Sequence, residues 1–175
     1  NFHVTNAMVD AGARFVAARH EGGAATMADA FARTTDRPAA VTVHQGCGLT
    51  NAMTGITEAA KSRTPVVVVA AEVTEPRSNF FVDQEALARA VGAVPIRVQD
   101  PDTAVAVAGE AVRTAIGARR TVLLNLPLAV QAMKATSSRA EPVEPVEPVV
   151  PVEPTHHPAV STGSTDGATD IERLV

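Results

Sequence analysis

The sequence is almost devoid of aromatic side chains: its 175 residues include five Phe and neither Trp nor Tyr. Its core must therefore be built from Val, Ala, Leu and Ile, a composition common in parallel sheets that are buried on both faces. Hydrophobic residues make up 46% of the chain. This amount suits one packed domain with an appendage.

The sequence also lacks the features of several other classes of protein. No block of Lys or Arg interrupts a chain of formal net charge −4, so we expect no nucleic acid as partner. No apolar run is long enough to span a bilayer and no signal peptide opens the chain, so we expect no membrane either. The single cysteine, Cys47, excludes an internal disulfide and favours a reducing, cytoplasmic location.

Short β-branched runs alternate with Ala-rich helical segments over the first 130 or so residues. The run Val66–Ala71 is too short for a buried helix and predicts a central strand. Further strands are predicted over 14–18, 39–44, 94–98 and 121–126, and helices over 2–10, 21–35, 49–62 and 105–116. In the last helix, the predicted apolar face consists of Val105, Ala108, Val112 and Ile116. The alternation indicates βαβ units, and hence an α/β fold with a parallel sheet in a three-layer α/β/α sandwich.

The character of the sequence changes after about Met133. Residues 141–154 have the sequence EPVEPVEPVVPVEP, with proline recurring at every third position. Three residues per turn is the period of polyproline II, so these prolines would line one edge of an extended rod. We expect an α/β domain over residues 1–133, an extended Pro-rich linker over 134–169, and the start of a further, truncated domain over 170–175. Because the first residue is Asn1 rather than Met, we expect a fragment or a processed product.

Two predicted strand-to-helix junctions carry most of the polar residues that could do chemistry. They are ARHEGGAATMADAFAR, residues 18–33, and VHQGCGLTNAMTG, residues 43–55. In an open parallel sheet, ligands bind at the carboxyl ends of the strands, where these loops are expected to meet. Together they offer Glu21, His44, Gln45, Asn51 and the backbone amides around Gly46 and Gly48.

Each of these residues also has an ordinary structural interpretation. The helix macrodipole favours an acidic residue such as Glu21 in a first turn. Asn51 is a candidate helix cap, and His44 or Cys47 taken alone is more often structural than catalytic. The glycine turn lacks both the third glycine of the dinucleotide fingerprint and the Gly-Lys-Ser/Thr of phosphate loops. A nucleotide is therefore not the expected ligand.

Taken together, the two loops resemble those of thiamine-diphosphate-dependent enzymes of the acetolactate synthase type. RHEGGAATMADAFART is similar to the family segment RHEQGAAHMADGYAR, and HQGCGLTNAMTGITEAAKSRTPVVVVAAE is similar to its SGPGATN segment and the helix and strand that follow. The ending TVLLNLPLAVQ is similar to PVLIDIPKDVQ. The resemblance runs from about Phe2 to Gln131 in constant order. It implies the thiamine-diphosphate-binding fold of the N-terminal, pyrimidine-binding domain.

The resemblance implies thiamine diphosphate as cofactor and gives Glu21 the central role. In the family, the glutamate at this position hydrogen-bonds N1′ of the aminopyrimidine. This bond favours the imino tautomer and so lets the cofactor form the C2 ylid that attacks the carbonyl of a 2-keto acid. By the same resemblance, Gly46, Gly48 and Asn51 are expected to bind the cofactor. Gln84 matches the glutamine of the family's Phe-Gln-Glu in the substrate region and is expected to be catalytic.

Departures from the family pattern bear on the substrate. His44 stands where acetolactate synthases carry a small hydroxyl residue. Benzoylformate decarboxylase-like members place a histidine there, and sulfoacetaldehyde acetyltransferase-like members share the His-Gln-Gly turn, so His44 is expected to move a proton to the substrate oxygen. Asp83 replaces an aromatic residue, so a more polar pocket is expected. The expected function is decarboxylation and carboligation of 2-keto acids. The alternatives are a benzoylformate-type decarboxylase, a sulfoacetaldehyde-type acyl transferase, a non-catalytic assembly domain, and a separate small subunit that pairs with another chain carrying the pyrophosphate-binding domain.

Other parts of the family's site are absent from the sequence. No GDG signature occurs, so the ligands of Mg²⁺ are expected in another domain and no metal site in this chain; FAD is left open. The family's first strand, which should precede Phe2, is also missing, and its loss would leave an unpaired sheet edge. In relatives the site forms between two subunits. We therefore expect a homodimer or homotetramer that binds a small 2-keto acid or aldehyde at the subunit interface, and an isolated chain that holds half a site and is inactive.

Overall fold

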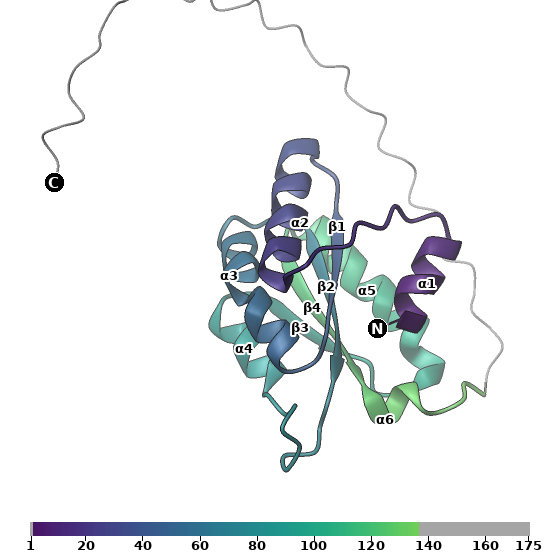
Figure 1. The fold of residues 1–175 in the computed structure, drawn as a ribbon. Helices are drawn as coiled ribbons and strands as arrows, with labels where there is room; N and C mark the ends of the chain where they lie inside the picture. Colours follow the sequence, from purple (N-terminus) through teal and green to yellow (C-terminus); the bar gives the residue numbers. More distant parts are fainter. Residues whose placement is uncertain (1, 137–175) are drawn as a thin grey trace, which may run out of the picture. The chain divides into compact units, whose positions relative to one another are not determined.

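A computed structural model describes residues 2–136 of the chain (Figure 1). Its main elements are α1 (Phe2–Asp10), α2 (Glu21–Thr35), β1 (Ala39–Val43), α3 (Cys47–Lys61), β2 (Val66–Glu72), α4 (Gln84–Ala90), β3 (Val94–Arg97), a 3₁₀ turn (Pro101–Thr103), α5 (Ala104–Gly117), β4 (Thr121–Pro127) and α6 (Leu128–Gln131). Apart from residues 134–136, the predicted linker (134–169) lies outside the described residues. So does the predicted start of a further domain (170–175).

The four strands form one parallel sheet in the order β1-β2-β4-β3. β1 pairs with β2, β2 with β4, and β4 with β3. All seven residues of β2 are buried, as expected for a β-branched strand covered on both faces. The predicted central strand and the parallel sheet are therefore confirmed.

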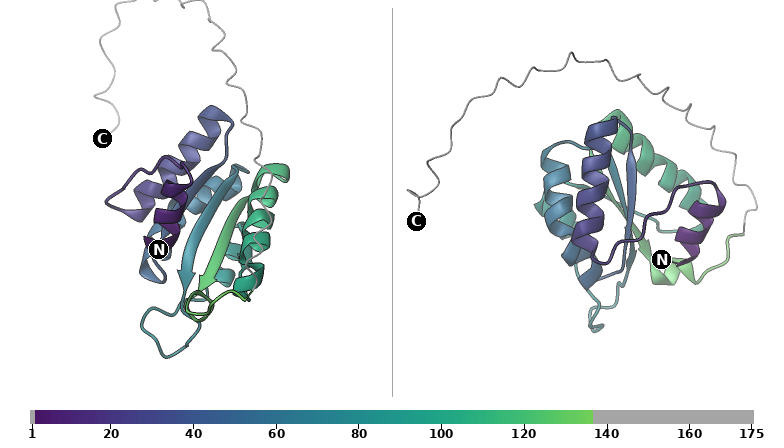
Figure 2. Two further views of the ribbon diagram at one scale, coloured as in Figure 1. Left: turned by 90° about the vertical axis from the view of Figure 1, so that its right-hand side faces the viewer. Right: turned by 45° about the horizontal axis from the view of Figure 1, so that its top comes forward.

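Helices cover both faces of the sheet and complete three layers (Figure 2). On one face, α2, α3 and α4 enclose a cluster that includes Ala25, Ile56 and Val68. On the other face, α5 packs over residues such as Val67 and Leu124, and α1 joins the same cluster. Small aliphatic side chains fill both clusters, which explains how the described core forms without a buried aromatic ring. None of the described helices combines the length and the apolar character needed to cross a bilayer.

The strand predicted over Arg14–Ala18 is wrong, because these residues form no strand. Phe15 and Val16 are instead 56% and 62% exposed. A β-favouring sequence forms a strand only beside a partner that satisfies its backbone groups. β1 lies at one edge of the sheet, and no strand among residues 2–136 pairs with its outer side. The extended segment therefore has no strand to join in the part of the chain that the structure describes.

The helix predicted over residues 105–116 is confirmed as α5, but its predicted apolar face is wrong for three of four residues. Ala111 and Ala115 are the fully buried side chains, whereas Val105, Val112 and Ile116 are exposed. Alanine lets the helix approach the valine-rich sheet closely, and a close-packed interface leaves no room for the larger residues. Side-chain size, rather than hydrophobicity alone, therefore decides which face of α5 turns inward.

Close packing of α2 against α3 holds the two predicted loops next to each other. A Cβ atom on Gly55 of α3 would lie only 2.7 Å from the Cβ atom of Ala25 in α2. Further along the same pair of helices, Arg33 donates hydrogen bonds to Asp29 and Glu58, at 3.0 and 2.8 Å. The glycine contact and the ion pairs together fix how the amino ends of α2 and α3 face each other.

Candidate functional site

The two loops meet at the carboxyl end of β1, where the parallel sheet was expected to place them. Glu21 is the first residue of α2, and the turn after β1 leads into α3 at Cys47. The Nδ2 atom of Asn51 donates a hydrogen bond of 3.2 Å to Oε2 of Glu21. A Cβ atom on Gly48 would lie 3.4 Å from the other carboxylate oxygen, Oε1. Three residues predicted for the site are thus in contact or nearly so.

His20, which the sequence analysis did not single out, fixes the start of α2. Its backbone is extended, and its Nδ1 atom accepts a hydrogen bond of 3.0 Å from the N–H of Gly22. This is the bond that a helix N-cap makes with the first turn. Since Nδ1 accepts, the proton of the neutral ring is on Nε2. The cap holds the first turn of α2 and therefore the backbone that carries Glu21.

Hydrogen bonds hold the pKa of Glu21 below its ordinary value. The largest cause is the backbone N–H of Glu21 itself, and the next is the side-chain amide of Asn51. Partial burial raises the pKa but does not overcome these bonds, and positive charge on His20 or His44 would lower it further. Glu21 is therefore a carboxylate at neutral pH and acts as a hydrogen-bond acceptor.

The turn after β1 needs both of its glycines. Gly46 has φ +64°, a conformation that L side chains rarely adopt, and a Cβ atom there would lie 2.8 Å from the carbonyl oxygen of Phe80. A Cβ atom on Gly48 would lie 2.8 Å from the Cβ atom of His44. The turn is therefore pressed between its own strand and the loop that carries Phe80. Cys47 is exposed at the first position of α3 rather than buried.

His44 is exposed at this turn, with its ring oriented by two neighbours. Its Nδ1 atom lies 3.0 Å from the carbonyl oxygen of Gln45. A carbonyl can only accept, so Nδ1 donates and Nε2 carries the lone pair of the neutral ring. The ring of Phe80 contacts the imidazole edge-on, with 5.8 Å between the ring centroids. His44 can therefore take up a proton at Nε2.

Gln84 lies on the inner side of the turn. It is the first residue of α4, a helix that the sequence analysis did not predict, and it is 1% exposed. Its Oε1 atom faces the N–H of Gly46 at 3.5 Å, and its Nε2 atom donates to Oδ1 of Asn125 at 2.8 Å. A contact between Gln84 and a substrate stays a prediction. Asn125 was missed, although one amide within the apolar run TVLLNLP was a usable signal.

A cluster of charged residues anchors α4 at the same edge of the sheet. Glu72, at the end of β2, is 3% exposed and accepts two hydrogen bonds from Arg97, at 2.8 and 2.6 Å. Chiefly through this contact, the pKa of Arg97 is raised. The guanidinium also lies 3.3 Å from Glu85 in α4. Asp83, which was expected to make the pocket more polar, uses its carboxylate to cap α4 by accepting the N–H of Ala86 at 2.9 Å.

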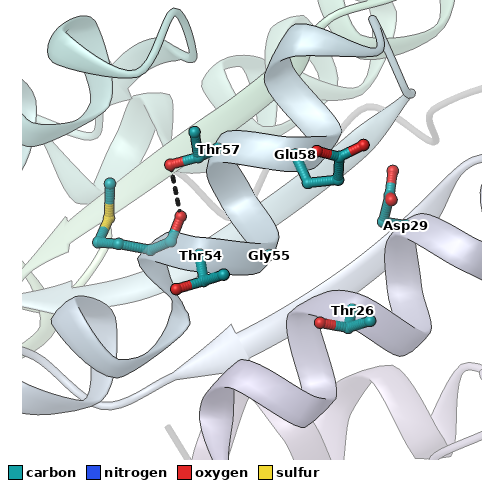
Figure 3. A pocket seen from close by; sticks show the side chains of 7 residues that line it. Thr26, Asp29, Thr54, Gly55, Thr57 and Glu58 are labelled. Atoms are coloured by element: carbon teal, nitrogen blue, oxygen red, sulfur yellow. Dashed lines mark hydrogen bonds between the residues drawn. The ribbon is translucent and has the colours of Figure 1, made fainter. Parts of the chain in front are cut away.

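An open groove of about 610 Å³ lies elsewhere, between the outer faces of α2 and α3 (Figure 3). It is lined by Thr26, Asp29, Met53, Thr54, Gly55, Thr57 and Glu58, and by none of the predicted site residues. Both of its carboxylates pair with Arg33, which lowers the pKa of Glu58. The groove is therefore a helix–helix junction with satisfied charges, and the polar cluster at the carboxyl end of β1 is the better candidate site. Within residues 2–136, no group of three His, Cys, Asp or Glu side chains could hold a metal ion.

Comparison with known proteins covers the two loops that carry Glu21 and His44. Residues 1–94 match the family model described as the N-terminal TPP binding domain of thiamine pyrophosphate enzymes. The chain is 36% identical to the acetolactate synthase of Bacillus subtilis over 101 residues, which cover 55% of this chain and 18% of that protein. It is 35% identical to the sulfoacetaldehyde acetyltransferase of Rhodobacter capsulatus over 121 residues, which cover 67% and 20%. The matches therefore span about a fifth of the length of these relatives.

Proposed function

The chain belongs to the thiamine pyrophosphate enzyme family and carries its N-terminal cofactor-binding domain, and from this premise we propose that it forms the pyrimidine-binding half of an active site for 2-keto acids. The observation that carries the proposal is the carboxylate of Glu21, held by Asn51 at the carboxyl end of the sheet. An assembly-only domain has no need of an oriented carboxylate between two glycine-rich loops. The enzymatic interpretation is therefore preferred.

The residues around Glu21 fit the aminopyrimidine of thiamine diphosphate. A carboxylate that stays ionised at neutral pH can accept a charge-assisted hydrogen bond from a ring N–H. No atom lies within 4 Å of the Cβ position of Gly23 in the first turn of α2, so a flat ring can approach there. When bound, the cofactor supplies a thiazolium carbon that adds to a carbonyl group and then holds the electron pair released on decarboxylation.

The chain's own residues would bind, orient and move protons. Glu21 holds the proton at N1′ of the pyrimidine by accepting a hydrogen bond from it, and Asn51 keeps the carboxylate in place. His44 would pass a proton between Nε2 and the substrate oxygen, since its other nitrogen is committed to Gln45. Gly46 and Gly48 let the turn approach the cofactor closely. The diphosphate and Mg²⁺ would be held by residues of another domain, and we propose no role for FAD.

A second candidate is acyl transfer of the sulfoacetaldehyde acetyltransferase type. Its support is the His-Gln-Gly turn at His44 together with the similarity to the Rhodobacter capsulatus enzyme. Both candidates use the same cofactor and the same Glu21. They differ in the acceptor of the two-carbon unit, so product analysis separates them.

We propose that a second subunit covers this site in a homodimer or homotetramer. Glu21 and its neighbours form an open surface, and a reaction of this kind requires water to be excluded. Met27 and Phe31 lie one turn apart on α2, the helix that begins with Glu21, and both are exposed. Exposed large apolar residues beside an open site are typical of a surface that another protein covers.

The proposal is tested by Glu21→Gln in the enzyme that contains this chain. We expect turnover of a 2-keto acid, measured with thiamine diphosphate and Mg²⁺, to fall by roughly two or more orders of magnitude, the scale of lost general acid–base catalysis. Glu110→Gln is the matched control, because Glu110 is exposed on α5 at the opposite face of the sheet. Wild-type turnover in Glu21→Gln would refute the proposed role.

A further inference from the structure

Two buried amides, Gln84 and Asn125, connect the glycine turn to β4. We infer that Asn125 is a positioning residue that acts through Gln84 on the backbone of the turn between His44 and Gly48. This inference deepens the proposed function and depends on it for the importance of the turn. The positioning itself can be measured without any cofactor or substrate.

The hydrogen bonds of this pair can run in one direction only. The N–H of Gly46 can only donate, so Gln84 must present Oε1 to it, at 3.5 Å. The Nε2 atom of Gln84 then faces Asn125, which must present Oδ1, at 2.8 Å. The orientation of both side chains is therefore coupled to a single backbone amide in the turn.

The burial of Asn125 lowers the stability of the fold, so stability alone does not explain an amide at this position. Asn125 is 0% exposed, and its Nδ2 atom has no hydrogen-bond partner among the described residues. A buried amide with an unsatisfied nitrogen is less stable than an apolar residue of similar shape in the same core. The rest of the strand before it is apolar apart from Thr121. An amide at this position therefore calls for a function, and its one satisfied atom is the oxygen that holds Gln84.

The segment that carries Gln84 is itself firmly anchored. Asp83 caps α4, and Glu85 lies 3.3 Å from Arg97, whose guanidinium is bound to the buried carboxylate of Glu72. Arg97 is also the register partner of Asn125 in the neighbouring strand β3. The pair of Gln84 and Asn125 thus connects a turn with two glycines, whose backbone is conformationally permissive, to a segment that is firmly anchored.

The turn needs such a tie because it carries His44, the residue proposed to pass a proton to the substrate. Gly46 has positive φ, and Cys47, which follows it, does not fix φ as a proline would. The ring of His44 is oriented by Gln45 and Phe80, so a movement of the turn would displace the ring. Loss of the Gln84 contact on the inner side should let the turn fluctuate, since the Phe80 backbone that packs against Gly46 belongs to another loop.

Amide hydrogen exchange in the 175-residue chain tests this inference. We expect Asn125→Leu, which removes the acceptor for Gln84, to accelerate exchange of the Gly46 amide by about tenfold or more. Asn125→Asp keeps an acceptor oxygen and should leave the rate within about threefold of wild type. Thr64→Val is the matched control: Thr64 is also buried with an unpartnered hydroxyl among the described residues, but it precedes β2 at the opposite end of the sheet.

Two results would overturn the inference. One is equal exchange at Gly46 in Asn125→Leu and Thr64→Val. The other concerns the double variant. If Asn125 acts through Gln84, adding Asn125→Leu to Gln84→Leu should not accelerate exchange at Gly46 any further. Accelerations of the two single variants that multiply in the double variant would therefore refute the inference. If Asn125→Leu does not fold, the wild-type chain decides: the side-chain amide protons of Gln84 must exchange slowly, and fast exchange refutes the pair. Since no readout uses cofactor, failure here is distinct from failure of the proposed activity.

Discussion

Replacing Gly55 by alanine tests whether the close approach of α2 and α3 holds the two site loops together. An added Cβ atom would lie 2.7 Å from the Cβ atom of Ala25, 2.9 Å from the backbone nitrogen of Thr26 and 3.0 Å from the carbonyl carbon of Ala25. Carbon atoms in contact are ordinarily about 3.5–4.0 Å apart. Two of the three atoms belong to the backbone, so α2 as a whole must move away to make room.

The expected loss of stability is the difference between two effects. Overpacking of this kind costs about 1–3 kcal/mol, and the rigid backbone favours the upper end of that range. Alanine in place of glycine within a helix returns about 1 kcal/mol. The net destabilisation is therefore about 1–2 kcal/mol, which corresponds to a fall in Tm of roughly 4–8 °C for a domain of this size.

Thermal unfolding followed by circular dichroism measures the effect, with Gly23→Ala as the control. Gly23 is also helical, but no atom lies within 4 Å of its Cβ position, so alanine there should raise stability by up to about 1 kcal/mol. The two substitutions should thus shift Tm in opposite directions. A Gly55→Ala protein as stable as wild type would show that the two helices do not pack as described.

Two further predictions concern the charged groups near the site. Arg97→Leu leaves the buried carboxylate of Glu72 without its partner and should destabilise the chain by about 2–4 kcal/mol in urea denaturation. Arg89→Leu is the control, because it breaks only an exposed pair and should cost less than about 1 kcal/mol. Equal losses of stability in the two variants would contradict this account. Glu21 should titrate below the ordinary pKa of a glutamate. Its hydrogen bonds therefore add stability above that ordinary pKa, and this stability is lost as pH falls through the lowered pKa. Asn51→Ala should raise the pKa of Glu21 in an NMR titration, because it removes one of these bonds. An unchanged pKa in Asn51→Ala would remove Asn51 as a cause.

The sequence was a good guide wherever local pattern and burial agree. Val66–Ala71 was predicted as a central strand because a short apolar run led by four valines is typical of a strand buried on both faces of a parallel sheet. The same reasoning failed for Arg14–Ala18, because strand formation depends on a neighbour that a local pattern does not specify. It also failed on α5, where closeness to the sheet selects Ala111 and Ala115 over larger residues.

The candidate site also contains residues that the sequence predicted and residues that it did not. Glu21 and Asn51 were predicted from their loops, and the parallel topology brings them to 3.2 Å. His20 and Asn125 were missed because their roles depend on partners: one caps a helix whose start had to be known, and the other meets Gln84 across 41 positions of sequence. Motifs located the residues that are predicted to face a ligand, whereas the contacts that hold those motifs in place are set by the fold.

The lowered pKa of Glu21 also says what a partner would add. Its two largest causes, the backbone N–H and Asn51, lie within this chain, and the opposing one is burial. Covering the site would remove water from the carboxylate, which disfavours its charged form and so opposes the two hydrogen bonds. Assembly should therefore raise the pKa of Glu21 from its low value in the open chain. This rise moves the carboxyl group towards the range in which it can share a proton with a ring nitrogen, which general acid–base chemistry near neutral pH requires. The chain orients the carboxyl group, and the surface that covers it would tune its acidity.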